Sequence, residues 1–266
     1  MVLLSAGGTA EPDGHRAEVS GAQAEAVRTA AAETSGSAVV VRATYYTDPL
    51  CCWSWAFEPQ WRRLRRACVG RLAWRVRMGG MIRRWGEYDD PLNAIHRPGQ
   101  MGPLWLQAER ETGVRMESRV WVDDPPDSSW PACLAFKAAE LQSPFAGDLY
   151  LGRMRQALFV ESRNIARHEV LRDVAIECAA ASPAKFDAAR WERDVGSAEA
   201  QRAFREDVGE ARMLGIGRFP TLILERIGGG RKVLTGWRPY EALAGELLAL
   251  APELGDALSP DAASAG

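Results

Sequence analysis

Lysine and histidine are scarce in this sequence. The chain of 266 residues has 33 lysines and arginines, of which only Lys137, Lys185 and Lys232 are lysines, and it has 3 histidines. The histidines lie far apart and form no pair with the spacing of metal ligands, so we expect no metal site. A formal net charge of -2 provides no bulk attraction for nucleic acid or for an anionic membrane surface.

Long hydrophobic runs are also missing. No stretch approaches the roughly 20 consecutive apolar residues that cross a bilayer, and the segment from Met1 to Gly8 has no positively charged region of the kind a signal peptide carries. We therefore expect no membrane span and no export, and a cytoplasmic location in which disulfides are rare. The 5 cysteines are an odd number in a large chain and do not make a disulfide framework.

The length suits one large domain or a domain that carries an insertion, because single cores usually divide beyond about 250 residues. With 47% apolar and 26% charged residues, the chain has the composition of an ordinary globular protein. Residues 1–37 contain hardly any large apolar side chain, and we expect them to form a tail. A second tail is expected at residues 253–266.

Between the tails, strand and helix patterns alternate at both ends of the chain. Residues 38–46 (AVVVRATYY) are rich in β-branched and aromatic side chains and predict a buried strand. The other predicted elements are a helix at 51–69, a strand at 71–78, helices at 102–112, 130–141, 146–159, 168–180, 183–195 and 198–214, strands at 221–226 and 232–234, and a helix at 240–250.

The order of these elements is β-α-β, a helical block, then β-β-α. Neither end has enough strands for a sheet of its own, so we expect both ends to join in one mixed sheet of an α/β fold with a large all-helical insertion. The predicted units are the first half of the sheet domain at 38–82, the insertion at 83–211 and the second half at 212–252.

A cysteine stands where the first predicted strand turns into the first predicted helix, in the segment Asp48-Pro49-Leu50-Cys51-Cys52-Trp53-Ser54-Trp55. In the first turn of a helix, Cys51 would face unpaired backbone N–H groups and the positive end of the helix dipole. Both favour the thiolate, so we expect a lowered pKa and a reactive thiol. An ordinary buried cysteine is the alternative, but open α/β sheets have their functional sites at the carboxyl ends of the strands, where Cys51 stands.

A proline just before the third predicted strand is the second marker. It lies in the segment Gly215-Ile216-Gly217-Arg218-Phe219-Pro220-Thr221. Proline at the start of a strand can simply mark a sheet edge, and only about one X–Pro bond in twenty is cis. A cis bond before Pro220 is a stronger expectation here, because the predicted reactive cysteine follows an earlier strand.

The two markers together resemble the DsbA-related branch of the thioredoxin-fold family, in which a helical domain is inserted into a β-α-β/β-β-α frame. The resemblance covers about residues 39–250, and residues 120–139 and 157–165 are similar to parts of the insert in cytoplasmic members. It implies a DsbA-like thioredoxin fold and chemistry at a thiol.

The resemblance also implies roles for particular residues. Cys51 would be the nucleophilic thiol, and Pro220 would be cis, which leaves the backbone of Phe219 and Thr221 free to pair with an extended substrate. The remainder of the active-site turn would consist of Asp48, Pro49, Cys52 and Trp53.

One position departs from the dithiol members of the family. They carry a resolving cysteine three residues after the nucleophile, where this chain has Ser54. Cys52 is a poor substitute, because neighbouring Cα atoms lie about 3.8 Å apart and disulfides usually need about 4.4 Å or more. Cys68 would lie roughly 25 Å away along the same helix, and Cys133 and Cys178 are interpreted as buried residues of the insert.

Ser54 is therefore expected to hydrogen-bond the Cys51 sulfur, and release of a mixed disulfide would need an external thiol such as glutathione. We predict a monothiol thiol-disulfide oxidoreductase that acts on a protein or small-molecule thiol or disulfide. No tightly bound cofactor is expected, with glutathione as a possible co-substrate, and the protein would be a monomer or a homodimer.

Two other functions stay open. Kappa-class glutathione transferases and 2-hydroxychromene-2-carboxylate isomerases share the fold, and kappa members carry a Ser-Pro-Tyr-Ser-Trp turn with which Cys51-Cys52-Trp53-Ser54-Trp55 aligns. A third class is not enzymatic: some cytoplasmic proteins of this fold, with a similar Asp-Pro-Leu-Cys turn, are adaptors that present a transcription factor to a protease.

Overall fold

The computed structural model describes residues 38–258. The predicted tail at 1–37 and residues 259–266 of the second predicted tail lie outside the described residues. The remainder of that second tail, residues 253–258, was predicted wrongly. It continues from α10 (Tyr240–Leu250) into a 3-10 turn (Pro252–Leu254) and the short helix α11 (Gly255–Leu258), because Leu254 and Leu258 are buried in the core.

One mixed sheet contains all four predicted strands, as the sequence indicated. Its order is β2-β1-β3-β4, with β1 parallel to β2 and antiparallel to β3. The bounds are β1 (Val41–Thr47), β2 (Leu72–Met78), β3 (Thr221–Arg226) and β4 (Arg231–Thr235). Gly228, Gly229 and Gly230 join β3 to β4 with φ values of 92°, 126° and 98°, a left-handed backbone that favours glycine.

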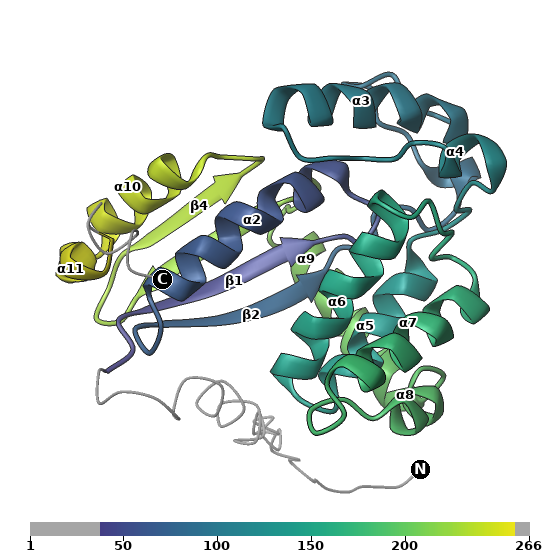
Figure 1. The fold of residues 1–266 in the computed structure, drawn as a ribbon. Coiled ribbons are helices and arrows are strands. Elements are labelled where there is room, and N and C mark those ends of the chain that lie inside the picture. Colours follow the sequence, from purple (N-terminus) through teal and green to yellow (C-terminus); the bar gives the residue numbers. More distant parts are fainter. Residues whose placement is uncertain (1–37, 259–266) are drawn as a thin grey trace, which may run out of the picture.

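Helices cover both faces of the sheet (Figure 1). On one face α2 (Cys52–Ala67) packs beside α10, and on the other α9 (Ala198–Met213) packs on β2. Beneath α2, the ring of Tyr45 lies 5.7 Å from that of Phe57 and 5.6 Å from that of Trp61. This aromatic packing fixes α2 on β1 and so places its first turn at the end of β1.

The helical insert lies beyond the carboxyl ends of β1 and β2 (Figure 1). Its helices are α3 (Met101–Thr112), α4 (Val120–Asp123), α5 (Trp130–Glu140), α6 (Pro144–Phe159), α7 (His168–Ala181), α8 (Ala188–Asp194) and α9. Figure 1 and the contacts of α9 with both α5 and β2 show that α9 joins the insert to the sheet.

Two parts of the insert differ from the all-helical block that the sequence predicted at 83–211. Residues 83–100 contain only two 3-10 turns and a bridge between Asp90 and Ile95. The helix predicted from residue 183 begins at Ala188, because the Asp187 side chain accepts a hydrogen bond from Arg190 N and caps the helix there. The short helix α4 was not predicted.

A group of buried charges, which we call the α9 cluster, holds the insert against β2. The Asp207 carboxylate is fully buried and lies 2.7 Å from Arg77 Nη1 and 2.9 Å from Lys137 Nζ. It also accepts a hydrogen bond of 3.0 Å from Met78 N, and Lys137 pairs with Glu140 as well. The cluster consists of Arg77, Lys137, Glu140 and Asp207. Within residues 38–258, no helix is long and apolar enough to cross a membrane.

Candidate active site

Asp48 anchors the turn between β1 and α2. Its buried carboxylate accepts hydrogen bonds from Leu50 N at 2.9 Å, from Met81 N at 2.7 Å and from the Ser129 hydroxyl at 2.9 Å. The Cys133 thiol also donates to it, at 3.7 Å. Burial raises the pKa of Asp48, although each of these donors lowers it. The turn is therefore tied to the loop after β2 and to the start of α5.

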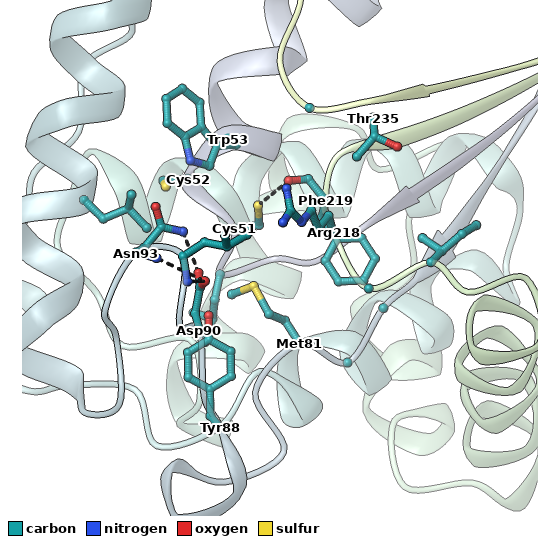
Figure 2. A pocket seen from close by; sticks show the side chains of 18 of the residues that line it. Cys51, Cys52, Trp53, Met81, Tyr88, Asp90, Asn93, Arg218, Phe219 and Thr235 are labelled. Atoms are coloured by element: carbon teal, nitrogen blue, oxygen red, sulfur yellow. Dashed lines mark hydrogen bonds between the residues drawn. The ribbon is translucent and has the colours of Figure 1, made fainter.

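Cys51 is the residue immediately before α2, and its side chain is only 6% exposed. Its Sγ donates a hydrogen bond of 3.3 Å to the backbone carbonyl of Phe219, as Figure 2 shows. Cys51 is thus a thiol that faces the loop before β3.

The predicted lowering of the Cys51 pKa is wrong in direction. Burial raises the pKa of this thiol, and the nearby carboxylate of Asp48 raises it further. Hydrogen bonding by Ser54 and the positive charge of Arg155 lower it without outweighing burial. The sequence indicated a helix start, but the depth at which the sulfur is buried decides the sign.

Ser54 lies in the first turn of α2 with its hydroxyl oxygen buried. Among the described residues this oxygen has no regular hydrogen-bond partner. It is near enough to the Cys51 sulfur to lower the pKa of the thiol. An unpaired buried hydroxyl is unfavourable by about 1–3 kcal/mol. A thiolate or a sulfur adduct on Cys51 would give the Ser54 hydroxyl a hydrogen-bond partner and remove this cost.

The neighbouring Cys52 is a second buried thiol in the site. Burial raises its pKa well above the ordinary value, and the adjacent Cys51 raises it further. Figure 2 shows the two sulfurs directed to different sides, with that of Cys51 toward Phe219 and that of Cys52 toward Trp53. All five cysteines are free thiols, and Cys68, Cys133 and Cys178 are buried in the core, where Cys133 contacts the turn through Asp48.

The loop before β3 meets the Cys51 thiol. The Phe219–Pro220 peptide bond is cis, as the resemblance implied. The hydroxyl of Thr221 donates to Arg218 O at 2.8 Å, which closes the loop. Thr221 is already in register with Tyr46 on β1 and Thr235 on β4, so its backbone is not free in the way that was predicted. Of the two residues whose backbone was expected to be free, only Phe219 lies before the start of β3.

A glycine makes room for the Phe219 ring. A Cβ atom added to Gly79 would lie 1.9 Å from Phe219 Cζ, which no real contact permits. Gly79 follows β2 directly and its N–H donates to Thr47 O at 2.7 Å. The end of β2 and the loop before β3 therefore touch across the site.

The thiol lies in a cavity of about 1060 Å³. The loop at residues 87–93 and α3 line one wall, and the end of α9 and the residues before β3 line the other. Figure 2 shows Tyr88, Asp90 and Asn93 on the first side and Arg218 and Phe219 on the second. The residues that line the cavity and carry charge are Glu87, Asp89, Asp90, Glu111, Arg212 and Arg218.

The wall at 87–93 was not predicted from the sequence, because this segment lies in the block that was expected to be helical. A local signal was available. Asp90 is followed by proline, and its carboxylate accepts from Asn93 N and Asn93 Nδ2, as aspartate does in turns. The pair Asp90-Pro91 thus marked a loop and not a helix.

A second missed feature is a buried charge behind the turn. Arg155 on α6 is 0% exposed and pairs with Glu58 on α2, Nη1 to Oε2, at 2.7 Å. It also donates to the hydroxyl of Thr47. The other carboxylate oxygen of Glu58 is 2.6 Å from Arg62 Nε, and these cations lower the pKa of Glu58 despite its burial. We call Thr47, Glu58, Arg62 and Arg155 the α6 cluster.

No group of three or more His, Cys, Asp or Glu side chains among residues 38–258 is arranged to hold a metal ion.

A family model described as thioredoxin matches residues 45–243, and the match includes the turn, the insert and the loop before β3. The chain belongs to the DsbA-like thioredoxin-fold family.

Relatives in this family differ in function. The chain is 28% identical over 197 residues to the ClpXP adapter protein SpxH of Halalkalibacterium halodurans. The aligned region covers 73% of this chain and 62% of the adapter. The chain thus spans about three fifths of the length of that curated relative. Among solved structures, the cytosolic disulfide reductase DsbM of Pseudomonas aeruginosa is 25% identical with a TM-score of 0.61, covering 79% of this chain and 100% of DsbM. A 2-hydroxychromene-2-carboxylate isomerase shares the fold, at 12% identity and a TM-score of 0.53 over 81% of this chain and 97% of the isomerase.

Proposed function

We propose that the protein is a monothiol thiol-disulfide oxidoreductase that acts through Cys51. The observation that carries the proposal is the position of the Cys51 sulfur, in the cavity and 3.3 Å from the Phe219 carbonyl that precedes the sheet. Ser54 stands where a resolving thiol would be needed, so exchange would involve one protein thiol only.

Substrate docking would activate the thiol. An extended segment that pairs with the backbone of Phe219 takes over the carbonyl to which Cys51 now donates. The thiol then loses its acceptor, gives its proton to water, and the thiolate can turn to the buried hydroxyl of Ser54. The raised pKa of free Cys51 is consistent with a thiol that becomes reactive only on docking.

The exchange at Cys51 has two balanced steps, and a third step in solution completes the reduction. The Cys51 thiolate attacks a disulfide RS–SR′, forms the mixed disulfide of Cys51 with RS, and releases R′S⁻. A small thiolate such as that of glutathione then attacks the RS sulfur, which regenerates the Cys51 thiolate and carries RS away as a disulfide with the small thiol. A second small thiolate attacks the disulfide that RS now forms with the first and releases RS⁻, so the substrate disulfide is reduced by two electrons that two small thiols supply as they become one small disulfide.

A protease adaptor is the second candidate. The curated relative at 28% identity is a ClpXP adapter protein, and the burial that raises the Cys51 pKa would suit a cysteine with no chemical role. In that case the cavity would receive a segment of a partner protein. A cytosolic location would fit either function, since the similar disulfide reductase is described as cytosolic.

Reaction with oxidised glutathione separates these functions. We expect one mixed disulfide on Cys51, found by intact mass and peptide mapping, which reduced glutathione removes. Cys51→Ser should form none, and Cys52→Ser, the matched control at the neighbouring thiol, should form it as the unchanged protein does. Tight glutathione binding without an adduct would point to the transferase or isomerase class. Neither adduct nor binding would leave the adaptor as the better account.

A further inference from the structure

We propose that Arg155, which the insert contributes through α6, is a positioning residue for the Cys51 thiol: it fixes the first turn of α2 through Thr47 and Tyr45 and keeps a permanent positive charge on the buried side of the sulfur. The inference deepens the proposed function, because it concerns how the same thiol is made ready for exchange.

The burial of Arg155 itself calls for an explanation. Its side chain is 0% exposed, and taking a charge out of water is unfavourable by several kcal/mol even when it is paired. Packing alone does not require it, since apolar residues of similar volume often replace a buried ion pair with no loss of stability. One of its nitrogens, Nε, also has no hydrogen-bond partner among the described residues.

A chain of hydrogen bonds leads from Arg155 to the turn that carries the thiol. Arg155 donates to the hydroxyl of Thr47, the last residue of β1. Thr47 Oγ1 donates to Tyr45 Oη at 3.3 Å, and Tyr45 Oη donates to the backbone carbonyl of Ser54 at 3.4 Å. The chain thus ends on the residue whose hydroxyl faces the Cys51 sulfur.

The charge of Arg155 acts on the sulfur directly. It lowers the pKa of Cys51, and in return a Cys51 thiolate stabilises the charged guanidinium. A guanidinium does not lose its proton in proteins, so this contribution is present at every pH. Asp48, on the other side of the turn, acts in the opposite direction.

Glu58 does not cancel the charge of Arg155. The carboxylate of Glu58 is shared between Arg155 at 2.7 Å and Arg62 at 2.6 Å. Two cations and one anion leave the group positive. The titratable and charged groups that face the thiol or this group are Tyr45, Asp48, Cys52, Glu58, Arg62, Arg65, Tyr88, Asp148 and Arg155.

The test is the pH dependence of alkylation at Cys51 by iodoacetamide, followed by peptide mapping so that each cysteine is read separately. The double variant Glu58→Met/Arg155→Met removes both members of the buried pair, and Arg62, which then loses Glu58 as a partner, has a side chain that is 41% exposed to water. We expect its Cys51 to react about tenfold more slowly at pH 7, because loss of the Arg155 charge raises the pKa of the thiol and lowers the thiolate fraction. Arg155→Lys keeps the charge and should react within about threefold of the unchanged protein.

Lys137→Met is the matched control, because Lys137 is a buried cation of the insert that pairs with Asp207 and not with a residue near the thiol. It should leave the Cys51 profile unchanged. The proposal is overturned if the folded double variant keeps the original profile, or if Lys137→Met shifts it equally. Alkylation needs no disulfide substrate, so a failure of exchange with glutathione would not affect this result.

Discussion

Two groups of buried charges join the insert to the sheet, and they lie on different sides of it. The α9 cluster holds α9 and α5 against β2, whereas the α6 cluster holds α6 against α2 and β1. Both contain a fully buried carboxylate or guanidinium. Only the α6 cluster connects with Cys51, through Tyr45, Ser54 and the charge of Arg155. Buried ion pairs of similar appearance can therefore serve the architecture alone in one place and the reactive group in another.

The largest effect on stability is expected when the α9 cluster loses its buried carboxylate. Asp207→Ala would leave Lys137 with one partner fewer and Met78 N without its acceptor. We expect a loss of about 3–5 kcal/mol in the free energy of unfolding, measured with urea, because an uncompensated charge stays buried.

The alkylation rate of Cys51 should not change in this variant, provided that it is measured where the protein is folded. Asp194→Ala is the control, since its pair with Arg190 is on the surface and should contribute less than about 1 kcal/mol. A change in Cys51 reactivity in Asp207→Ala would contradict the distinction between the two clusters.

A smaller, pH-dependent effect is expected at the carboxylate of the α6 cluster. The pKa of Glu58 is lowered in the folded protein, so its ionised form stabilises the fold above the unfolded value of about 4.3 and this contribution is lost as the pH falls through the folded value. Glu58→Gln should therefore lower stability by about 2–4 kcal/mol at pH 7 and by much less at pH 3.

Urea unfolding of both proteins at pH 7, 5 and 3 tests this sign. The prediction is contradicted if the difference in unfolding free energy between Glu58→Gln and the unchanged protein is constant or grows toward pH 3. Arg155 and Arg62 would then not stabilise the ionised form of the Glu58 carboxylate.

The smallest effect on stability is expected at the contact between Gly79 and the Phe219 ring, beside the Cys51 thiol. Gly79→Ala places a methyl group 1.9 Å from the Phe219 ring and must displace it, which should destabilise the fold by about 1–3 kcal/mol. The shift also moves the carbonyl that holds Cys51 Sγ, so alkylation of Cys51 should become faster.

Gly217→Ala is the matched control from the same cavity, because a Cβ there meets nothing within 4 Å. If both variants behave alike, the contact between Gly79 and Phe219 does not control access to the sulfur.

The sequence was sufficient for the parts of the site that depend on local pattern. The strand before Cys51, the helix after it and the cis bond at Pro220 were all predicted from neighbouring residues and the family resemblance. The α6 cluster was not, because Arg155 meets Glu58 and Thr47 across 97 and 108 positions of the chain, and only the fold brings them together.

The predicted direction of the Cys51 pKa shift was wrong for a related reason. The helix start that favours a thiolate is visible in the sequence, but the burial that outweighs it depends on how the insert and the loop before β3 close over the turn. The wall of the cavity at residues 87–93 was likewise hidden, since its place opposite Cys51 follows from the tertiary fold.

The central claim, exchange by one thiol, is tested most directly by turnover. The substrate is a peptide disulfide, reduced in the presence of glutathione, with the formation of oxidised glutathione followed over time. We expect multiple turnovers for the unchanged protein and for Cys52→Ser, and none above the uncatalysed rate for Cys51→Ser. Equal rates with and without the unchanged protein, or turnover that survives Cys51→Ser, would contradict it.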